Sequence, residues 1–345
     1  MNSQCTYHKS AKPQQPRNRV ARTFGESAEW SEHQGPDALY GNGFLDLLRT
    51  LRIGQWPKNL LLLAAPFFAW FDPAQKLQAK GIESVAVSLT LAVGAFCLLS
   101  AASYIVNDLR DRPRDAVHPL RRVRPIAARK VSFGAALVLT LLCFAGGAGL
   151  AWLTHSVPFM VVCAAYVILQ PLYTFLFRRV EGLAVLALAT GFVLRAVGGA
   201  EICDVRVSPW LLLCVFLVAL FVALCKRRSE HFLRPVPETR VPSPSAADQR
   251  ILDLEIGVSA ASVIACYALY TLATETIALY HTDRLVYTLP IVVFGVFRYL
   301  RLTYGENRAG TPERVFTRDP LMLTTLIVWL FSCAAILWMA GSGNA

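Results

Sequence analysis

Charged residues are scarce in this chain, because Asp, Glu, Lys and Arg make up only 17% of its 345 residues. An average soluble domain carries about 25%. Hydrophobic residues make up 55% of the chain, and its mean hydropathy is +0.45. This shortage of charge argues against a soluble globular protein and favours a chain whose solvent is the lipid bilayer.

Paired cysteine motifs and the common nucleotide and protease motifs are also missing. The nine cysteines show no CxxC spacing and lie mostly within apolar runs, which is typical of small hydrophobic residues rather than of disulfides or metal sites. No Walker loop, GxGxxG turn or HExxH helix occurs. The net charge of +11 indicates basic cytoplasmic loops rather than nucleic-acid binding, because the basic stretches lack interleaved aromatic residues that stack on bases.

The chain does contain apolar runs near the length of about 20 residues that a helix needs to cross a membrane. The nine predicted spans are residues 53–71, 84–106, 131–153, 157–177, 182–200, 209–225, 257–280, 285–304 and 320–340. They predict an all-α fold, a polytopic membrane bundle of nine transmembrane helices. Residues 1–40 are polar and rich in Gln, Arg and Ser, which predicts a disordered tail before a transmembrane domain over 41–345.

The distribution of Lys and Arg between the loops predicts the orientation of these spans. Loops 107–130 and 226–256 hold eight and six basic residues, whereas each loop on the other side holds two at most. Basic loops stay on the cytoplasmic side. The pattern therefore predicts a multi-pass protein of the cell (inner) membrane, with a cytoplasmic N-terminus, an external C-terminus and an active site that faces the cytoplasm.

The stretch "NDLRDRPRD" follows the second predicted span and concentrates three carboxylates. Asp108, Asp111 and Asp115 stand at i, i+3 and i+7, which an α-helix places within an arc of about 60°. Mg²⁺ is the cation that best suits them, because it binds oxygen and bridges one or two carboxylates to substrate phosphates. All three are predicted catalytic residues, with Asp108 and Asp111 as metal ligands. Asn107 beside them is a predicted substrate-binding residue.

The stretch "HPLRRVRPIA" comes next and adds more guanidinium groups than three carboxylates need. Arg121, Arg122 and Arg124 are predicted to bind substrate phosphate, because the planar guanidinium holds two phosphate oxygens at once. Carboxylates for a metal beside arginines for phosphate predict a site for an anionic, metal-bound substrate. The plainer interpretation is a solvated loop whose acids balance its bases, and the helical spacing of the aspartates argues against it.

Two further clusters fall on the predicted cytoplasmic side. In "LRIGQWPKN", Lys58 and Asn59 would reach the side of the carboxylates, although Trp and Lys at this depth also anchor spans at the membrane interface. In "ALCKRRSEHFL", Lys226, Arg227 and Glu230 follow the sixth predicted span, where topology alone predicts a basic stop. All five are candidate substrate-binding residues.

Arg195 lies well inside a predicted span, within "ALATGFVLRAVGGA". A cation at this depth is costly and is usually paired. Three interpretations stay open: it holds an anionic lipid head group, it pairs with Glu201 or Asp204, or it reaches toward the far interface.

These motifs resemble those of a known family. "NDLRDRPRD" is similar to the N-D-x-x-D-x-x-x-D motif of the UbiA superfamily of intramembrane prenyltransferases. Further stretches resemble the branch of this superfamily that contains decaprenyl-phosphate phosphoribosyltransferases. They are "LRIGQWPKN", "HPLRRVRPIA", "VSPWLLLCVFLVALFVALCKRRSE", "TDRLVYTLPIVVFGVFRYL" and "TPERVFTRDPLML". The likeness covers residues 44–340.

The resemblance implies a nine-helix bundle, Mg²⁺ dependence, and transfer of the 5-phosphoribosyl group from phosphoribosyl diphosphate (PRPP) to a polyprenyl phosphate such as decaprenyl phosphate. Diphosphate would be released, and the product would serve cell-envelope biosynthesis. A homo-oligomer stays open. The residues carried over from the family's motifs are Asp108, Asp111, Asp115 and Asn107 of the Asp motif, Lys58 and Asn59 of QWxKN, and Lys226, Arg227 and Glu230 of KRxxE.

Two features depart from the wider superfamily. Members that act on prenyl diphosphates carry a second Asp-rich motif after the sixth span, where this chain has KRRSE. This disfavours aromatic prenyl transfer, the alternative activity. Pro113 lies inside the first motif and predicts that the helix ends or kinks there, because proline removes a helical hydrogen bond. Asp115 is then left to bind either the metal or the ribose.

A transporter is a further alternative from a different class. Charge inside the membrane is common in transporters, but this chain shows no internal repeat and concentrates its charge at one face. The sequence therefore favours an enzyme.

Overall fold

The computed structural model describes residues 43–75, 77–118, 121–232, 245–305, 315–316 and 318–342. The chain forms two compact units, residues 1–45 and 46–345. The first unit lies almost wholly outside the described residues, and so does the tail predicted over 1–40. The second unit carries every candidate site residue and is described by itself.

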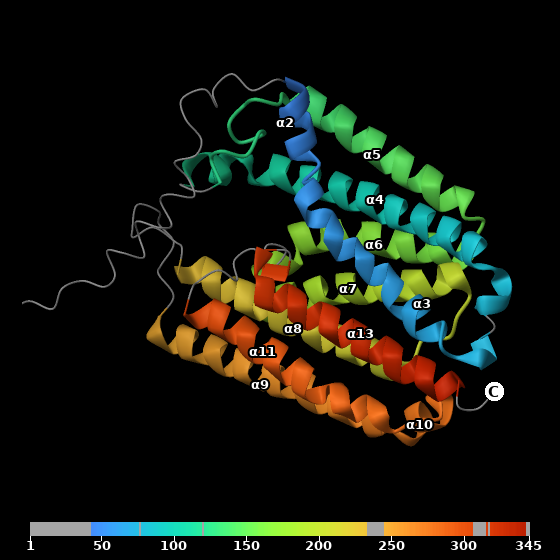
Figure 1. Ribbon diagram of the computed structural model, residues 1–345. Coiled ribbons are helices and arrows are strands. Elements are labelled where there is room, and N and C mark those ends of the chain that lie inside the picture. The colour runs from blue at the N-terminus through green and yellow to red at the C-terminus, as the bar shows by residue number, and fades with distance from the viewer. Residues whose placement is uncertain are drawn as a thin grey trace, which may run out of the picture. The chain divides into compact units, whose positions relative to one another are not determined.

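Every regular element in the described ranges is a helix, as the predicted all-α fold requires. The α-helices are α2 (Gly43–Thr50), α3 (Ala64–Ala69), α4 (Ile82–Val117), α5 (Phe133–Leu153), α6 (Val157–Phe175), α7 (Glu181–Cys203), α8 (Pro209–Phe232), α9 (Ala246–Leu272), α10 (Thr274–Tyr280), α11 (Leu289–Tyr304) and α13 (Pro320–Ser342) (Figure 1). The 3₁₀ helices are Ile53–Leu63, Pro73–Gln75, Gln78–Lys80, Phe177–Arg179 and Arg284–Thr288.

Eight helices in the described part of the chain are long and apolar enough to cross a membrane. They are residues 82–117, 133–153, 157–175, 182–203, 209–230, 246–272, 284–304 and 320–342. Each overlaps one of the predicted spans from 84–106 onward, so the apolar runs located these helices correctly. The orientation of the spans stays a prediction.

Two boundary differences are the largest: α4 ends at Val117 instead of near residue 106, and α9 begins at Ala246 although the apolar run begins near residue 257. The Ser245 hydroxyl accepts a hydrogen bond from the Asp248 N–H at 3.1 Å, and the Asp248 carboxylate accepts one from the Ser245 N–H at 2.9 Å. This reciprocal capping box satisfies backbone donors at the start of the helix. The helix therefore starts in polar sequence, which a prediction from apolar residues alone misses.

The first predicted span, 53–71, is not one continuous helix. It consists of the 3₁₀ helix Ile53–Leu63, called the 53–63 segment below, followed by the short helix α3. Pro57 lies inside the former and Pro66 inside the latter, and each proline removes a backbone donor that an α-helix would use. Eleven 3₁₀ residues and six α-helical residues together rise about 31 Å, close to the thickness of a bilayer core.

Helix α4 does not end at Pro113. It runs for 36 residues to Val117, so of the two predicted outcomes at this proline, an end or a kink, the structure excludes the end. The proline stands in the last turns, where only one hydrogen bond, to the carbonyl four residues earlier, is lost. Because the helix continues, Asp115 stays on the same face as Asp108 and Asp111.

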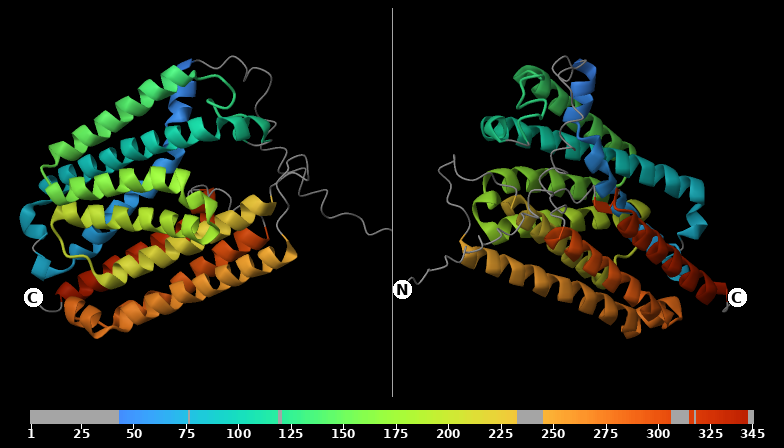
Figure 2. Two further views of the ribbon diagram at one scale, coloured as in Figure 1. Left: turned by 180° about the vertical axis from the view of Figure 1, so that it is seen from behind. Right: turned by 60° about the vertical axis from the view of Figure 1, so that its left-hand side comes forward.

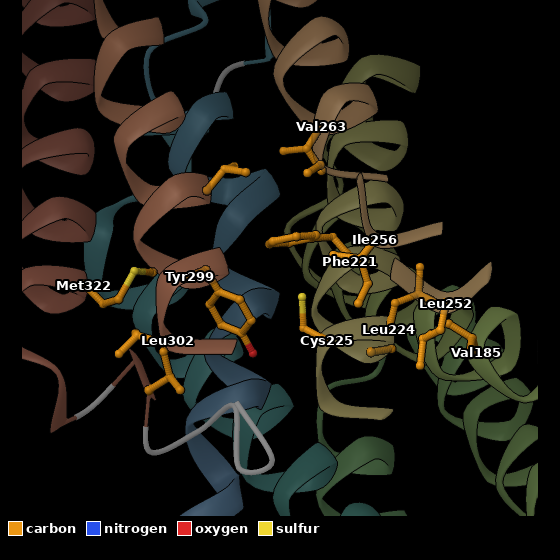
Figure 3. Close-up of a cluster of buried hydrophobic side chains, with 14 residues drawn as sticks. Val185, Phe221, Leu224, Cys225, Leu252, Ile256, Val263, Tyr299, Leu302 and Met322 are labelled. Atoms are coloured by element: carbon orange, nitrogen blue, oxygen red, sulfur yellow. The ribbon is translucent and has the colours of Figure 1, made fainter. Parts of the chain in front are cut away.

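Neighbouring helices in sequence pack side by side, as α4 does with α5, α6 with α7, and α8 with α9 (Figure 2). One buried apolar cluster joins α8, α9 and α11, with Phe221, Ile256 and Tyr299 at its centre (Figure 3). A second cluster joins the 53–63 segment, α4 and α6 through Leu62, Phe96 and Tyr166, among others. The second cluster fixes the 53–63 segment and α4 relative to each other, and these two elements carry half of the predicted site residues.

Candidate active site

The three aspartates of α4, called the acidic cluster below, lie on the face that the helix turns into the protein. Their exposed fractions are 5% for Asp108, 4% for Asp111 and 2% for Asp115. A buried carboxylate needs a cation or several hydrogen-bond donors, because its removal from water is costly. Arginines from three other parts of the chain supply these partners.

Asp108 binds two guanidinium groups. Nε of Arg52 donates a hydrogen bond to Oδ2 at 3.0 Å, and Nη2 of Arg52 donates to Oδ1. Nη1 of Arg124 lies 3.2 Å from the same Oδ1. Arg52 immediately precedes the 53–63 segment and Arg124 lies in the loop after α4, so Asp108 ties both to the helix.

Asp111 pairs with an arginine from a different connection. Arg178 lies in the 3₁₀ helix Phe177–Arg179 that follows α6. Its Nη1 donates to Oδ2 of Asp111 at 2.6 Å and to Oδ1 of Asn107 at 3.2 Å. Asn107 therefore stands beside the acidic cluster, as predicted from the motif, and shares one guanidinium with Asp111.

Asp115 connects the acidic cluster to α8. Nη1 of Arg124 lies 2.5 Å from its Oδ2, and Nη1 of Arg121 lies 4.0 Å from its Oδ1. Nη2 of Arg121 in turn contacts Oε1 of Glu230 at 3.1 Å. Two residues predicted from separate motifs, Arg121 and Glu230, are thus direct partners.

His118 ends α4 next to this pair. Its Nδ1 accepts a hydrogen bond from the backbone N–H of Arg121 at 3.3 Å. Burial, and after it the neighbouring Arg121 guanidinium, lowers the pKa of His118 below its usual 6.5. The neutral imidazole is therefore favoured at neutral pH, which keeps Nδ1 available as the acceptor.

Among the described residues, the carboxylates of the site pair with an equal number of arginines. The three carboxylates of the acidic cluster and the carboxylate of Glu230 pair with four arginines, namely Arg52, Arg121, Arg124 and Arg178. A guanidinium binds phosphate through the same two-pronged geometry as carboxylate. The arrangement can therefore accept an anion that also brings cationic charge, because each arginine can exchange a carboxylate oxygen for a phosphate oxygen.

The other predicted site residues are placed less uniformly. Lys58 is half-buried on the 53–63 segment, and Lys226 and Arg227 are half-buried near the end of α8. Arg122 is exposed in the loop after α4. Asn59 is 1% exposed and lies away from the acidic cluster, against Arg195. The structure thus brings Asn107, Arg121, Arg124 and Glu230 to the acidic cluster but not Asn59.

Two arginines of the site were not among the predicted site residues. Arg52 is the second residue of the quoted motif "LRIGQWPKN", so its position in that motif was a usable signal. Arg178 stands in a short basic loop that topology alone explains. Arg178 contacts Asp111, which is 67 residues away in the sequence. No local sequence pattern predicts that contact.

Arg195 lies against neutral groups and not against Asp204, one of its predicted partners. It is 4% exposed, and its guanidinium binds Asn59, Ser100, Tyr166 and the Gly191 carbonyl. Asp204, one of its candidate partners, is exposed and contacts Lys80 instead. Arg195 is therefore held within the bundle by neutral groups.

The chemistry of the acidic cluster fits Mg²⁺. Its donors are carboxylate oxygens, with the Asn107 amide oxygen beside them, and hard cations prefer oxygen ligands. Within the described ranges, no three acidic, histidine or cysteine side chains converge as a complete metal site. Mg²⁺ is commonly held by one or two carboxylates while substrate phosphates and water complete its shell. Asp108 and Asp111 can supply that share.

Comparisons with known proteins agree on the family. The family model described as the UbiA prenyltransferase family matches residues 63–318. The decaprenyl-phosphate phosphoribosyltransferase of Mycolicibacterium smegmatis is 29% identical over an alignment of 306 residues, and the match covers 85% of this chain and 93% of that protein. The enzyme of the same name from Corynebacterium glutamicum is 28% identical over 292 residues, 83% of this chain and 84% of that protein.

The fold agrees as well. The solved structure of a UbiA homologue from Archaeoglobus fulgidus, bound to DMAPP and Mg²⁺, superimposes with a TM-score of 0.60 at 17% identity and covers 86% of this chain and 99% of that one. The likeness at this identity concerns the fold alone. The family match over most of the chain carries the assignment, and the chain is a transferase that belongs to the UbiA prenyltransferase family.

Proposed function

We propose that this protein transfers the 5-phosphoribosyl group from PRPP to a polyprenyl phosphate, with Mg²⁺ as cofactor and with diphosphate as the leaving group. The relatives named decaprenyl-phosphate phosphoribosyltransferase support this reaction. The proposal includes a cell (inner) membrane location, with the acidic cluster on the cytoplasmic side where the basic loops lie.

One observation carries the proposal: three buried carboxylates and four arginines meet at one end of the helix bundle. A prenyl group needs no phosphate-binding arginines beyond those for its diphosphate. PRPP and a lipid phosphate together bring three phosphate-bearing positions. The abundance of guanidinium groups therefore favours a reaction in which both substrates carry phosphate.

In this reaction, each group of site residues would have a separate role. Asp108 and Asp111 would hold Mg²⁺, which neutralises charge on the leaving diphosphate when it is bound. Arg52, Arg124 and Arg178 would turn from carboxylate to phosphate oxygens and hold the donor in line with the acceptor. Asp115, Asn107 and Lys58 would orient the ribose and the remaining phosphate oxygens. This last assignment rests on the resemblance of the motifs.

The bond changes need no strong base. An oxygen of the lipid phosphate, which is already anionic, would form a bond to the anomeric carbon of the ribose. The bond from that carbon to the diphosphate oxygen would break, and the electron pair would leave with diphosphate. Positive charge develops on the ribose during this exchange, so positioning and electrostatic stabilisation are expected to dominate the rate enhancement.

The decisive experiment supplies the purified full-length protein in lipid nanodiscs with isotope-labelled PRPP, decaprenyl phosphate and Mg²⁺. We expect a phosphoribosylated lipid in the mass spectrum of the lipid extract, together with released diphosphate. The matched control replaces decaprenyl phosphate by decaprenol, which lacks the attacking phosphate. A protein that ignores PRPP but transfers a prenyl group from a prenyl diphosphate to an aromatic acceptor would contradict the proposal.

A further inference from the structure

Arg195 places a cation inside the helix bundle with only neutral partners among the described residues. Its Nε donates to Oδ1 of Asn59 at 2.8 Å, and Nη1 donates to the Gly191 carbonyl at 2.7 Å. Its Nη2 donates to the hydroxyls of Tyr166 at 3.0 Å and Ser100 at 3.3 Å. A guanidinium keeps its charge at physiological pH, so these contacts have to compensate for the loss of water.

Aromatic rings complete the surroundings of this charge. The centre of the guanidinium lies 4.8 Å from the ring centroid of Tyr166, 5.4 Å from that of Phe192 and 5.9 Å from that of Phe96. Rings at such distances attract a cation through their electron-rich faces. The guanidinium is therefore fixed from several sides, which makes it a rigid point of attachment for Asn59.

Helix α7 holds the 53–63 segment at two points. Arg195 and Gly199 are spaced i and i+4, so they lie on one face of α7. Asn59 and Leu62 are spaced i and i+3, which a 3₁₀ helix places one above the other. Arg195 binds Asn59, and a Cβ atom added to Gly199 would overlap the Leu62 carbonyl. The backbone of the segment therefore touches α7 in one fixed register.

The residue that starts the same segment contacts the acidic cluster. Gln55 and Lys58 are again spaced by three residues, so they share a face of the 3₁₀ helix that differs from the face of Asn59. Arg52 stands at the start of the segment with φ 52° and ψ 46°, a left-handed conformation that residues other than glycine rarely adopt. Arg52 also binds Asp108. A shift in the register of the segment would move both Arg52 and Lys58.

We infer that Arg195 is a positioning residue: through Asn59 it fixes the register of the 53–63 segment and so places Arg52 against Asp108 of the acidic cluster. Its neutral setting suits this role, because no phosphate can displace a carboxylate partner there. The inference rests on the proposed function where it concerns the binding of PRPP, but the attachment of the segment does not depend on which substrate is used.

The test compares Arg195→Met, Asn59→Ala and the double variant in the full-length protein. Hydrogen–deuterium exchange should accelerate in peptides from the 53–63 segment and stay unchanged in peptides from α9 and α11. The KM for PRPP should rise about tenfold in each single variant, as expected for a hydrogen bond to a charged group, while kcat changes by less than about threefold. The double variant should be no worse than Arg195→Met, because both changes break one contact.

Two further variants serve as controls for this test. Arg195→Lys keeps the charge but offers fewer donors, so its KM should lie between those of wild type and Arg195→Met. Arg250→Met replaces an exposed arginine of α9 and should leave both exchange and KM unchanged. Unchanged exchange in the 53–63 segment, faster exchange throughout the protein, or losses that multiply in the double variant would overturn the inference. Because exchange is measured without substrate, failure of the wild type to use PRPP would refute the proposed function alone.

Discussion

Two sets of arginines occupy opposite electrostatic settings in this protein. Arg52, Arg124 and Arg178 each pair with a buried aspartate at the end of α4, whereas Arg195 has neutral partners inside the bundle. A paired arginine can exchange its carboxylate for a phosphate, because both anions accept the same hydrogen bonds. Among the residues that the structure describes, Arg195 has no carboxylate partner to exchange. The first setting suits ligand binding, and the second suits a fixed attachment.

Accessibility separates the two settings further. Between 18% and 30% of the side-chain surface of Arg52, Arg124 and Arg178 is exposed, while Arg195 is 4% exposed as a residue. An incoming phosphate can reach the former from solvent. It reaches the latter only if the helices move apart. The comparison predicts that substitutions at the acidic cluster act on chemistry and binding, and that substitutions around Arg195 act through geometry.

The largest effect is expected from Asp108→Asn. The substitution removes the charge of a proposed metal ligand, the anionic partner of Arg52 and one of the two carboxylates that Arg124 contacts. We expect kcat/KM to fall by roughly 10³-fold. The activity assay with PRPP and decaprenyl phosphate measures this loss, and circular dichroism checks that the helices remain. Asp204→Asn, at an exposed carboxylate, is the matched control and should keep wild-type activity. Wild-type activity in Asp108→Asn would exclude this aspartate from the chemistry.

The second-largest effect is expected from Gly199→Ala, which tests the attachment of the 53–63 segment to α7 near Arg195. The added methyl group would overlap the Leu62 carbonyl, so the 53–63 segment must move away from α7. Overpacking of this kind destabilises a protein by about 1–3 kcal/mol, and a small displacement of positioned groups lowers kcat/KM by up to about 100-fold. Thermal unfolding and the activity assay measure the two effects.

Gly149→Ala on α5 is the control for that variant. No atom lies within 4 Å of the position that its Cβ would take, and alanine is a better helix former than glycine by about 1 kcal/mol. Its Tm should therefore be equal to or above that of the wild type. If Gly199→Ala behaves in the same way, the close approach of the 53–63 segment to α7 does not limit the activity.

The acidic cluster and the contacts of Arg195 also differ in how well the sequence alone predicts them. The helical period placed Asp108, Asp111 and Asp115 on one face, and their joint burial confirms it. Apolar runs located eight helices, because membrane solvent imposes length and composition on each helix separately. These features depend on residues that are close in sequence.

The features that sequence reasoning missed depend on residues far apart in the chain. The contacts of Arg178 with Asp111 and of Arg195 with Asn59 join positions 67 and 136 residues apart. The 53–63 segment combines a proline, Pro57, with a close approach to α7, and it is a 3₁₀ helix. Only the proline is visible in the sequence. Tertiary packing decides such contacts, so a single sequence gives no local sign of them.

A third prediction concerns Arg178, the paired arginine that no motif indicated. Arg178→Met leaves Asp111 without its cation, and the KM for PRPP should rise about tenfold. Arg178→Lys keeps a cation opposite Asp111 but cannot bind Asn107 in the same geometry, so its KM should rise about threefold. Steady-state kinetics at saturating decaprenyl phosphate measures both values. Equal KM values for Met and Lys would show that charge at this position is irrelevant to donor binding.

The smallest effect is expected from the protonation of His118. Burial and the Arg121 guanidinium lower the pKa of His118 in the folded protein below its usual 6.5. The folded state therefore favours the neutral imidazole, and this stabilisation is present above about pH 6.5 and lost as the pH falls toward the folded pKa. Protonation removes the acceptor for the Arg121 N–H and adds a cation beside Arg121.

We therefore expect the KM for PRPP to rise by about two- to threefold between about pH 7.5 and pH 5.5, with most of the change below pH 6.5. His118→Asn keeps a side-chain acceptor that does not titrate, and its KM should lack this change. The pH profiles of both proteins, measured at constant ionic strength, separate His118 from titration of the substrate phosphates, which affects both equally. Identical profiles would mean that Arg121 is held by Asp115 and Glu230 alone, and that the local charge balance of the acidic cluster is independent of the histidine.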